Sequence, residues 1–301
     1  SNEKKKKEKK NKKKTKSATT HSTVRASTIP AGLIQIVPGT GETVGTQLAQ
    51  HKDIQLISLT GSMRAGKAVF ENAASTVKKV NLELGGNAPV IVTPNANIDK
   101  AVDYIVTARI KNAGQVCTCP ERIFVHEDIH DTFVDKVTEK MKSLTVGDPL
   151  DDKTDFGAII NKTQLNSIDD KVQAAVQNGA VLLLGGHILD RPGYFYAPTV
   201  LDHVKQTDAV FKEEIFGPVL AITTYQNFEQ VIDDANDTNA GLSSYIFSNE
   251  KSSIDTGVTF LIETLFLGAF SYFKNGKRHG ILLYTSMKLI FFALEAERFI
   301  L

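Results

Sequence analysis

An alternation of apolar runs and amphipathic segments between residues 33 and 82 constrains the fold most strongly. Leu33 to Val37 and Ile54 to Leu59 are short apolar runs typical of buried strands, and Glu42 to Gln50 between them has a helical pattern. A second helical stretch, Lys67 to Ser75, leads to a further short strand, Val80 to Leu82. Because strands joined by helical crossovers form parallel sheets covered on both faces, the sequence predicts an α/β fold.

The turn before the second helical stretch reads Thr-Gly-Ser-Met-Arg-Ala-Gly, residues 60–66. Glycines at a strand-to-helix turn let backbone N–H groups approach a phosphate, and a helix N-terminus favours the anion. The turn departs from the Gly-x-Gly-x-x-Gly fingerprint, and glycine turns without ligands are common, so both interpretations stay open. Glu83 follows the third expected strand, at the carboxyl edge where α/β sheets bind ligands. It is therefore either a catalytic base or a surface acid.

Both cysteines of the chain lie in the segment Asn112 to Arg122. This segment follows a helical pattern, Ile98 to Lys111, and precedes a β-branched run, Arg122 to His126, that is typical of a strand. A cysteine on a turn between a helix and a strand can be presented to a cleft by a rigid scaffold. Cys117 is therefore the candidate nucleophile.

Other roles for these cysteines stay open on the residues alone. A Cys-x-Cys metal half-site would need two further ligands, whereas the seven histidines are scattered, so no metal is expected. A disulfide between Cys117 and Cys119 would close a very small, strained ring. The strongest alternative is an inert buried thiol, because free cysteine is among the most buried residue types.

The charge of the chain is concentrated at its start. Residues 1–16 carry ten lysines against Glu3 and Glu8, a net +8, which leaves −7 for the rest of a chain whose net charge is +1. Such a run cannot bury apolar surface, so residues 1–28 are expected to be a disordered tail and linker that binds no specific nucleic acid. The apolar end, Ile281 to Leu301, is interrupted by charges and predicts no membrane span. With no secretory leader and no disulfide framework, the expected location is cytoplasmic.

Six segments together indicate a family. They are Ile29 to Gly32, Thr60 to Gly66, Leu82 to Gly86, Gly114 to Cys117, Gly193 to Thr199, and Glu213 to Pro218. In these segments the chain resembles the NAD(P)-dependent aldehyde dehydrogenase superfamily, and it is most similar to the lactaldehyde and glycolaldehyde dehydrogenases. The resemblance runs from about Ile29 to Asn249.

The resemblance implies a role for individual positions. Cys117 matches the nucleophile and Glu83 the general base. Glu214 matches the residue that holds the nicotinamide ribose, and Phe216 matches the aromatic beside the nicotinamide. The pyrophosphate would lie against three residues of the glycine turn, Gly61, Ser62 and Gly66. The implied reaction oxidises a small hydroxy-aldehyde to a carboxylic acid with NAD, or with NADP, through a cysteine thiohemiacetal and a thioester.

The same resemblance predicts the domain organisation. Residues 29–87 would form a partial Rossmann-type cofactor domain, residues 88–256 an α/β catalytic domain, and residues 257–301 a divergent remnant of the oligomerisation region. That divergence argues against the homo-oligomer of the family. The family's upstream oxyanion asparagine and cofactor lysine have no counterpart here, which indicates truncation at the N-terminus. The alternative function is therefore a non-catalytic remnant that binds at most a nucleotide or a partner.

Overall fold

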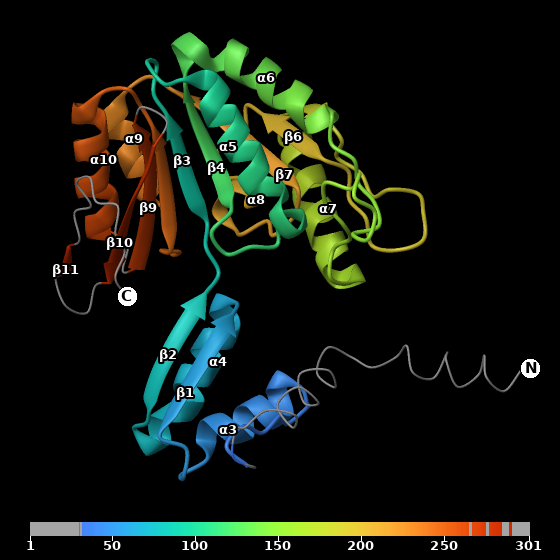
Figure 1. Cartoon of the computed structure of the whole chain (residues 1–301), viewed down its shortest axis with the longest axis vertical. Helices are drawn as coiled ribbons and strands as arrows, with labels where there is room; N and C mark the ends of the chain where they lie inside the picture. The colour runs from blue at the N-terminus through green and yellow to red at the C-terminus, as the bar shows by residue number, and fades with distance from the viewer. Residues whose placement is uncertain (1–29, 31, 265–266, 275–276, 285–288, 291–301) are drawn as a thin grey trace, which may run out of the picture. The chain divides into compact units, whose positions relative to one another are not determined.

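The chain divides into two compact units, Ser1–Glu83 and Leu84–Leu301. The computed structural model describes residues 30, 32–264, 267–274, 277–284 and 289–290 (Figure 1). The division falls four residues before the expected end of the cofactor domain at residue 87. The predicted Lys-rich tail and linker, residues 1–28, and the last eleven residues of the predicted C-terminal segment lie outside the described residues.

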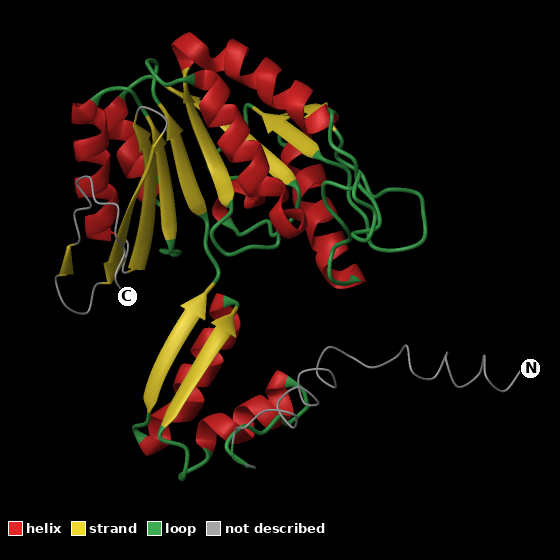
Figure 2. Ribbon diagram, viewed as in Figure 1, coloured by secondary structure: helices red, strands yellow, loops and turns green. Residues whose placement is uncertain are grey.

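The first unit contains one strand-helix-strand motif. Strands β1 (Leu56–Gly61) and β2 (Lys79–Leu84) form a two-stranded sheet, and Figure 2 shows them pointing the same way. Helix α4 (Met63–Ala73) connects them, followed by the 3-10 turn η2 (Ala74–Thr76). The predicted helix at 42–50 is a π-helical turn, η1 (Gly41–Gly45), that continues into α3 (Thr46–Gln50).

The predicted strand at Leu33 to Val37 was wrong. Residues 35–40 have no regular structure, and Leu33, Ile34 and Val37 are 72%, 46% and 60% exposed. An apolar run becomes a buried strand only where neighbouring strands accept its backbone hydrogen bonds. Within the described part of this unit the sheet has two strands, and neither pairs with this segment.

The second unit is built on a nine-stranded sheet with the order β11-β10-β9-β8-β3-β4-β7-β6-β5. Strands β9, β8, β3, β4, β7 and β6 are parallel neighbours, whereas β5, β10 and β11 pair in antiparallel fashion at the two edges. The strand bounds are β3 Ala88–Val92, β4 Pro120–His126, β5 Val181–Leu184, β6 Thr199–Asp202, β7 Val219–Tyr225, β8 Ser243–Phe247, β9 Leu267–Lys274, β10 Lys277–Tyr284 and β11 Leu289–Ile290. The predicted α/β fold is confirmed.

Helices cover both faces of this sheet (Figure 2). On one face, α5 (Ile98–Ile110) and α6 (His130–Lys142) pack on a core that includes Val90 and Val92 of β3. On the other, α7 (Lys162–Gln177), α8 (Ala209–Lys212), α9 (Phe228–Asn236) and α10 (Lys251–Thr264) pack on a core that includes Ile91. Alternate residues of a strand point to opposite faces, so β3 serves both cores. Two 3-10 turns, η3 (Lys111–Gly114) and η4 (Glu127–Ile129), flank β4.

The C-terminal part of the second unit crosses the boundary expected after residue 256. Helix α10 continues through that position, and β9 pairs in parallel with β8, so both elements belong to the same sheet structure as the predicted catalytic domain. Across the described ranges, none of the helices combines the length and the apolar character that crossing a membrane requires.

Candidate active site

A turn with an unusual backbone leads from α5 to Cys117. Asn112, Ala113 and Gly114 have φ values of 52°, 58° and 76°, so three successive residues adopt the left-handed conformation. A Cβ on Gly114 would lie 2.1 Å from the carbonyl oxygen of Gly217, which only glycine avoids. The turn leaves Cys117 half-buried, three residues before β4 begins.

Cys117 and Cys119 have different environments. Both are free thiols, which excludes the disulfide alternative. Cys119 is 2% exposed, and its S–H donates a hydrogen bond to the carbonyl of Ala108 at 3.4 Å. Burial raises the pKa of Cys119 to about 11, although the nearby Arg109 opposes the shift. The inert buried thiol considered from the sequence is therefore Cys119, and Cys117 is the accessible one.

The cysteine turn and Glu214 both pack closely against the backbone of Gly85 and Gly86. A Cβ on Gly86 would lie 2.3 Å from the carbonyl oxygen of Cys117, and a Cβ on Gly85 would lie 2.2 Å from Oε2 of Glu214. The backbone N–H of Gly86 donates to Oε1 of Glu214 at 3.2 Å. These close approaches bring the backbone of Cys117 and the carboxyl group of Glu214 to adjacent residues, and both of them to Gly86.

Glu214 is a half-buried carboxyl group with a perturbed pKa. Burial, together with the negative charge of Glu121, raises its pKa to about 7, although the Gly86 N–H and the cations of Arg109 and Lys171 oppose the shift. Near neutral pH this side chain therefore exists in both protonation states, and it can accept or donate a hydrogen bond to a hydroxyl group.

A buried ion pair joins the cysteine segment to the loop that carries Glu214. Arg109 Nη1 lies 2.8 Å from Glu121 Oε1, and these side chains are 0% and 2% exposed. Arg109 also donates to the carbonyls of Pro120, at 2.8 Å, and Gly217. Glu121 Oε2 accepts the backbone N–H of Ile215 at 3.2 Å. The pair thus fixes residues 120–121 and 215–217 relative to each other.

Sequence reasoning missed this ion pair. The local signal is the spacing of Ala101, Ile105 and Arg109, which places the arginine on the buried face of α5 but does not identify its partner. Its partner Glu121 lies in β4, where all residues from Pro120 to Val125 are buried. A charged residue at a position that the helical period buries is a signal for an internal ion pair.

Helix α7 holds the same loop from the other side. Gln164 Nε2 donates to the carbonyls of Ile215 and Phe216 at 3.0 Å and 3.3 Å, and Lys171 Nζ donates to the carbonyl of Glu214 at 3.1 Å. Phe216 has a φ of 53°, a conformation that a bulky residue adopts only when its surroundings impose it. The predicted ribose and nicotinamide contacts, Glu214 and Phe216, therefore stand on a fixed loop.

The remaining predicted site residues lie in the first unit. Gly61 ends β1, and Ser62 caps α4 by accepting the N–H of Ala65 at 3.2 Å. Gly66 is buried in the first turns of α4, and its N–H donates to the carbonyl of Ser62 at 2.9 Å. Since Ser62 Oγ is an acceptor in the cap, its own O–H can still donate to a ligand. Glu83 is half-buried in β2.

Comparison with known proteins identifies the family. The sequence profile described as "Aldehyde dehydrogenase family" matches residues 10–259. The chain belongs to the aldehyde dehydrogenase family. The resemblance predicted from the six segments is thereby confirmed.

Individual members of the family are similar over most of this aldehyde dehydrogenase chain. An aldehyde dehydrogenase of Enchytraeus buchholzi is 42% identical over 238 residues, which are 79% of this chain and 47% of that protein. The lactaldehyde dehydrogenase of Escherichia coli is 40% identical over 221 residues, 73% of this chain and 46% of that protein. The structure of 3,6-anhydro-L-galactose dehydrogenase in complex with NAP superposes with a TM-score of 0.77 at 37% identity, over 79% of this chain and 50% of that one. The chain thus spans about half the length of the relatives it matches.

Proposed function

We propose that this aldehyde dehydrogenase oxidises a small aldehyde, of the hydroxy-aldehyde class, to a carboxylic acid with NAD or NADP. The observation that carries the proposal is the half-buried free thiol of Cys117, on a turn whose Cys117 carbonyl packs against Gly86, next to Gly85, which packs against Glu214. Relatives that are named lactaldehyde dehydrogenase and D-glyceraldehyde dehydrogenase (NADP(+)) support both the substrate class and the cofactor.

Each unit, taken by itself, carries features that suit one part of a dinucleotide cofactor. Helix α4 is eleven residues long and begins at a capping serine that follows a glycine, which suits a pyrophosphate. Glu214 Oε2 lies 2.2 Å from where a Cβ on Gly85 would be, so glycine at this position leaves room for the carboxyl group beside the backbone. We assign Gly61, Ser62 and Gly66 to the pyrophosphate, Glu214 to a ribose hydroxyl and Phe216 to the nicotinamide side. When bound, the cofactor supplies a hydride acceptor.

The proposed chemistry begins at Cys117. Its thiolate adds to the carbonyl carbon of the aldehyde, and the resulting thiohemiacetal carries an oxyanion that the backbone N–H of Cys117 stabilises. Loss of hydride from this adduct leaves a thioester on Cys117. Water then cleaves the thioester, releasing the acid and the thiol. Glu83 is the proposed general base, which takes the proton from the thiol, releases it to solvent, and later takes a proton from the attacking water.

The test is NAD(P)H formation by the purified chain with lactaldehyde and with glycolaldehyde. Turnover should be abolished in Cys117→Ala and retained in Cys119→Ala, because the Cys119 thiol is buried and protonated. Equal turnover of the parent and Cys117→Ala would contradict the covalent mechanism. A folded chain that binds NADP without any turnover would instead support the nucleotide-binding alternative.

A further inference from the structure

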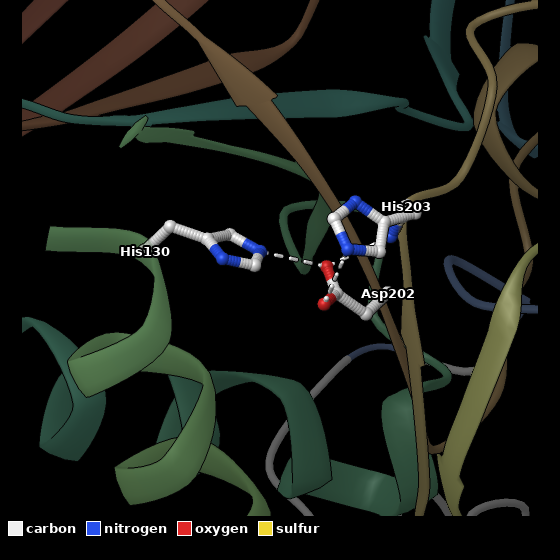
Figure 3. A group of neighbouring side chains, drawn as sticks. All are labelled: His130, Asp202 and His203. Carbon is white, nitrogen blue, oxygen red and sulfur yellow. Dashed lines mark hydrogen bonds and ion pairs between the residues drawn. The ribbon is translucent and has the colours of Figure 1, made fainter. Parts of the chain in front are cut away.

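Two histidines and one aspartate form a cluster outside the candidate active site (Figure 3). His130 is the first residue of α6, Asp202 is the last residue of β6, and His203 follows it directly. Cys117 precedes β4, and β7 lies between β4 and β6 in the sheet. The cluster therefore shares no residue with the site around Cys117.

The three side chains are spaced closely enough to bind one ion. Their nearest ligand atoms all lie within 4.8 Å of one another. Asp202 is central: its Oδ1 is 2.9 Å from His130 Nε2, and its Oδ2 is 3.6 Å from His203 Nε2. A tetrahedral ion with bonds of about 2.0–2.1 Å separates its ligand atoms by roughly 3.3–3.5 Å. Because the His203 side chain is 58% exposed, its ring can turn toward an ion, whereas ion binding would also have to lengthen the 2.9 Å contact between His130 and Asp202.

The surroundings of His130 match those of a metal-binding histidine. Its Nδ1 lies 2.9 Å from Oδ1 of Asp131, and a metal-bound imidazole almost always donates its other N–H to such a carboxylate. This contact orients the ring and leaves Nε2 toward Asp202. His130 and Asp202 are both nearly buried, at 8% and 7%, whereas His203 faces solvent. Three protein ligands with one open side leave a fourth position for water.

The backbone at His203 supplies an independent observation. Its φ is 50°, in the left-handed region that costs a residue with a Cβ about 1–2 kcal/mol. The N–H of His203 donates to Asp202 Oδ1 at 2.7 Å, which stabilises this turn. Backbone strain of this kind is common where residues are held for a ligand.

We propose that His130, Asp202 and His203 bind a divalent transition-metal ion, Zn²⁺ in the first place, with water as the fourth ligand. Two imidazole nitrogens and one carboxylate oxygen suit Zn²⁺ and Co²⁺, whereas Mg²⁺ and Ca²⁺ prefer oxygen ligands alone. The ion would connect the start of α6 to the end of β6. It would therefore stabilise the fold without taking part in aldehyde oxidation.

The experiment is calorimetric titration of the full chain with ZnCl₂, repeated with CoCl₂ to record the absorption bands of tetrahedral Co²⁺. Both are performed in the Cys117→Ala variant, so that the accessible thiolate cannot bind the ion. One saturable site is expected. His203→Asn should weaken Zn²⁺ binding about tenfold or more, because it removes a ligand at an exposed position where asparagine tolerates the left-handed backbone. His187→Asn, at an exposed histidine outside the cluster, is the matched control and should leave the affinity unchanged.

Two results would overturn the proposal. One is the absence of saturable Zn²⁺ binding by a chain whose circular dichroism shows it to be folded. The other is an affinity that His203→Asn and His187→Asn leave equally unchanged. In either case the cluster is an ion pair, in which a protonated His130 lies between the carboxylates of Asp131 and Asp202.

Discussion

At the scale of single residues, burial distinguishes two thiols that stand two positions apart. Cys119 is 2% exposed with a pKa raised to about 11, whereas Cys117 is half-buried on the turn. Only the thiolate form attacks an electrophile. We therefore expect iodoacetamide near neutral pH to alkylate Cys117 and to leave Cys119 unmodified, as measured by mass spectrometry of the peptides. Cys119 should react only after unfolding, and alkylation of both thiols at equal rates in the folded chain would contradict this assignment.

Glu214 predicts a dependence of stability on pH. Its pKa is raised from 4.5 to about 7 by burial, so folding favours the protonated form. The stabilising contribution is complete below pH 4.5 and is lost as pH rises through 7. Glu214→Gln removes this contribution. As pH rises from 4.5 to 7, the free energy of unfolding of the parent should therefore fall by about 1–2 kcal/mol relative to that of the variant. This figure is below that of the full shift because the side chain keeps contact with solvent. Chemical denaturation at several pH values measures the difference. Parallel pH profiles would show that Glu214 titrates normally.

The sequence singled out some residues of the candidate site and not others, for a physical reason. Cys117, Glu214 and Phe216 lie in short segments whose order along the chain carries the resemblance, and the structure holds all three on rigid turns. The pair of Arg109 and Glu121 was missed because its importance comes from partners up to 108 positions away, such as the carbonyl of Gly217. A local sequence pattern cannot pair residues that are so far apart in the chain.

At the scale of elements, the end of α5, the start of β4 and the loop at 213–218 are joined by one buried ion pair. Removal of one partner leaves the other charge buried and uncompensated, which typically costs about 3–5 kcal/mol. Glu121→Gln should therefore destabilise the second unit by an amount in this range, measured by urea denaturation. Lys136→Met, which breaks the exposed ion pair with Asp99, is the control and should change stability little. Equal effects of the two variants would show that Glu121 does not compensate Arg109.

The turn before Cys117 predicts a glycine requirement. In Gly114→Ala the alanine would have to adopt a φ of 76°. Its new Cβ would lie 2.1 Å from the carbonyl oxygen of Gly217. The left-handed conformation alone costs about 1–2 kcal/mol, and the required shift of the loop adds to it. We expect a lower melting temperature and slower alkylation of Cys117. Gly157→Ala, whose Cβ would make only ordinary contacts of 3.6 Å, should be close to neutral. A neutral Gly114→Ala would contradict the close approach.

Elements with a clear period were predicted well, and those that depend on distant partners were not. The helix expected at 98–111 and the strand expected at 122–126 are confirmed as α5 and β4. The strand expected at 33–37 failed because no neighbouring strand pairs with it among the described residues. Strand β3 was not anticipated, although all five of its residues are buried. Its place in the centre of the sheet follows from pairing with strands far along the chain.

At the scale of the whole molecule, the two units differ in how much they bury. Strands β1 and β2 contain no fully buried residue, and the only buried residues described in the first unit are Ala49, Gly66 and Ala73. We expect amide hydrogen exchange of the full chain to be faster in β1 than in β3 by orders of magnitude, because few apolar contacts oppose local opening. Mass spectrometry of peptic peptides measures this. Equal protection of β1 and β3 would mean that the first unit is as stable as the second.

The position of β3 also sets an order of events during synthesis on the ribosome. Val92 pairs with Phe247, which is 155 positions later in the chain. At about 5–20 residues per second, the nascent chain waits roughly 8–30 s before β8 exists, and until then one edge of an apolar strand lacks its permanent neighbour. A strand edge in that state can pair with another chain. Slower translation between β3 and β8 should therefore lower the yield of soluble protein, and a chaperone that covers this edge should restore it.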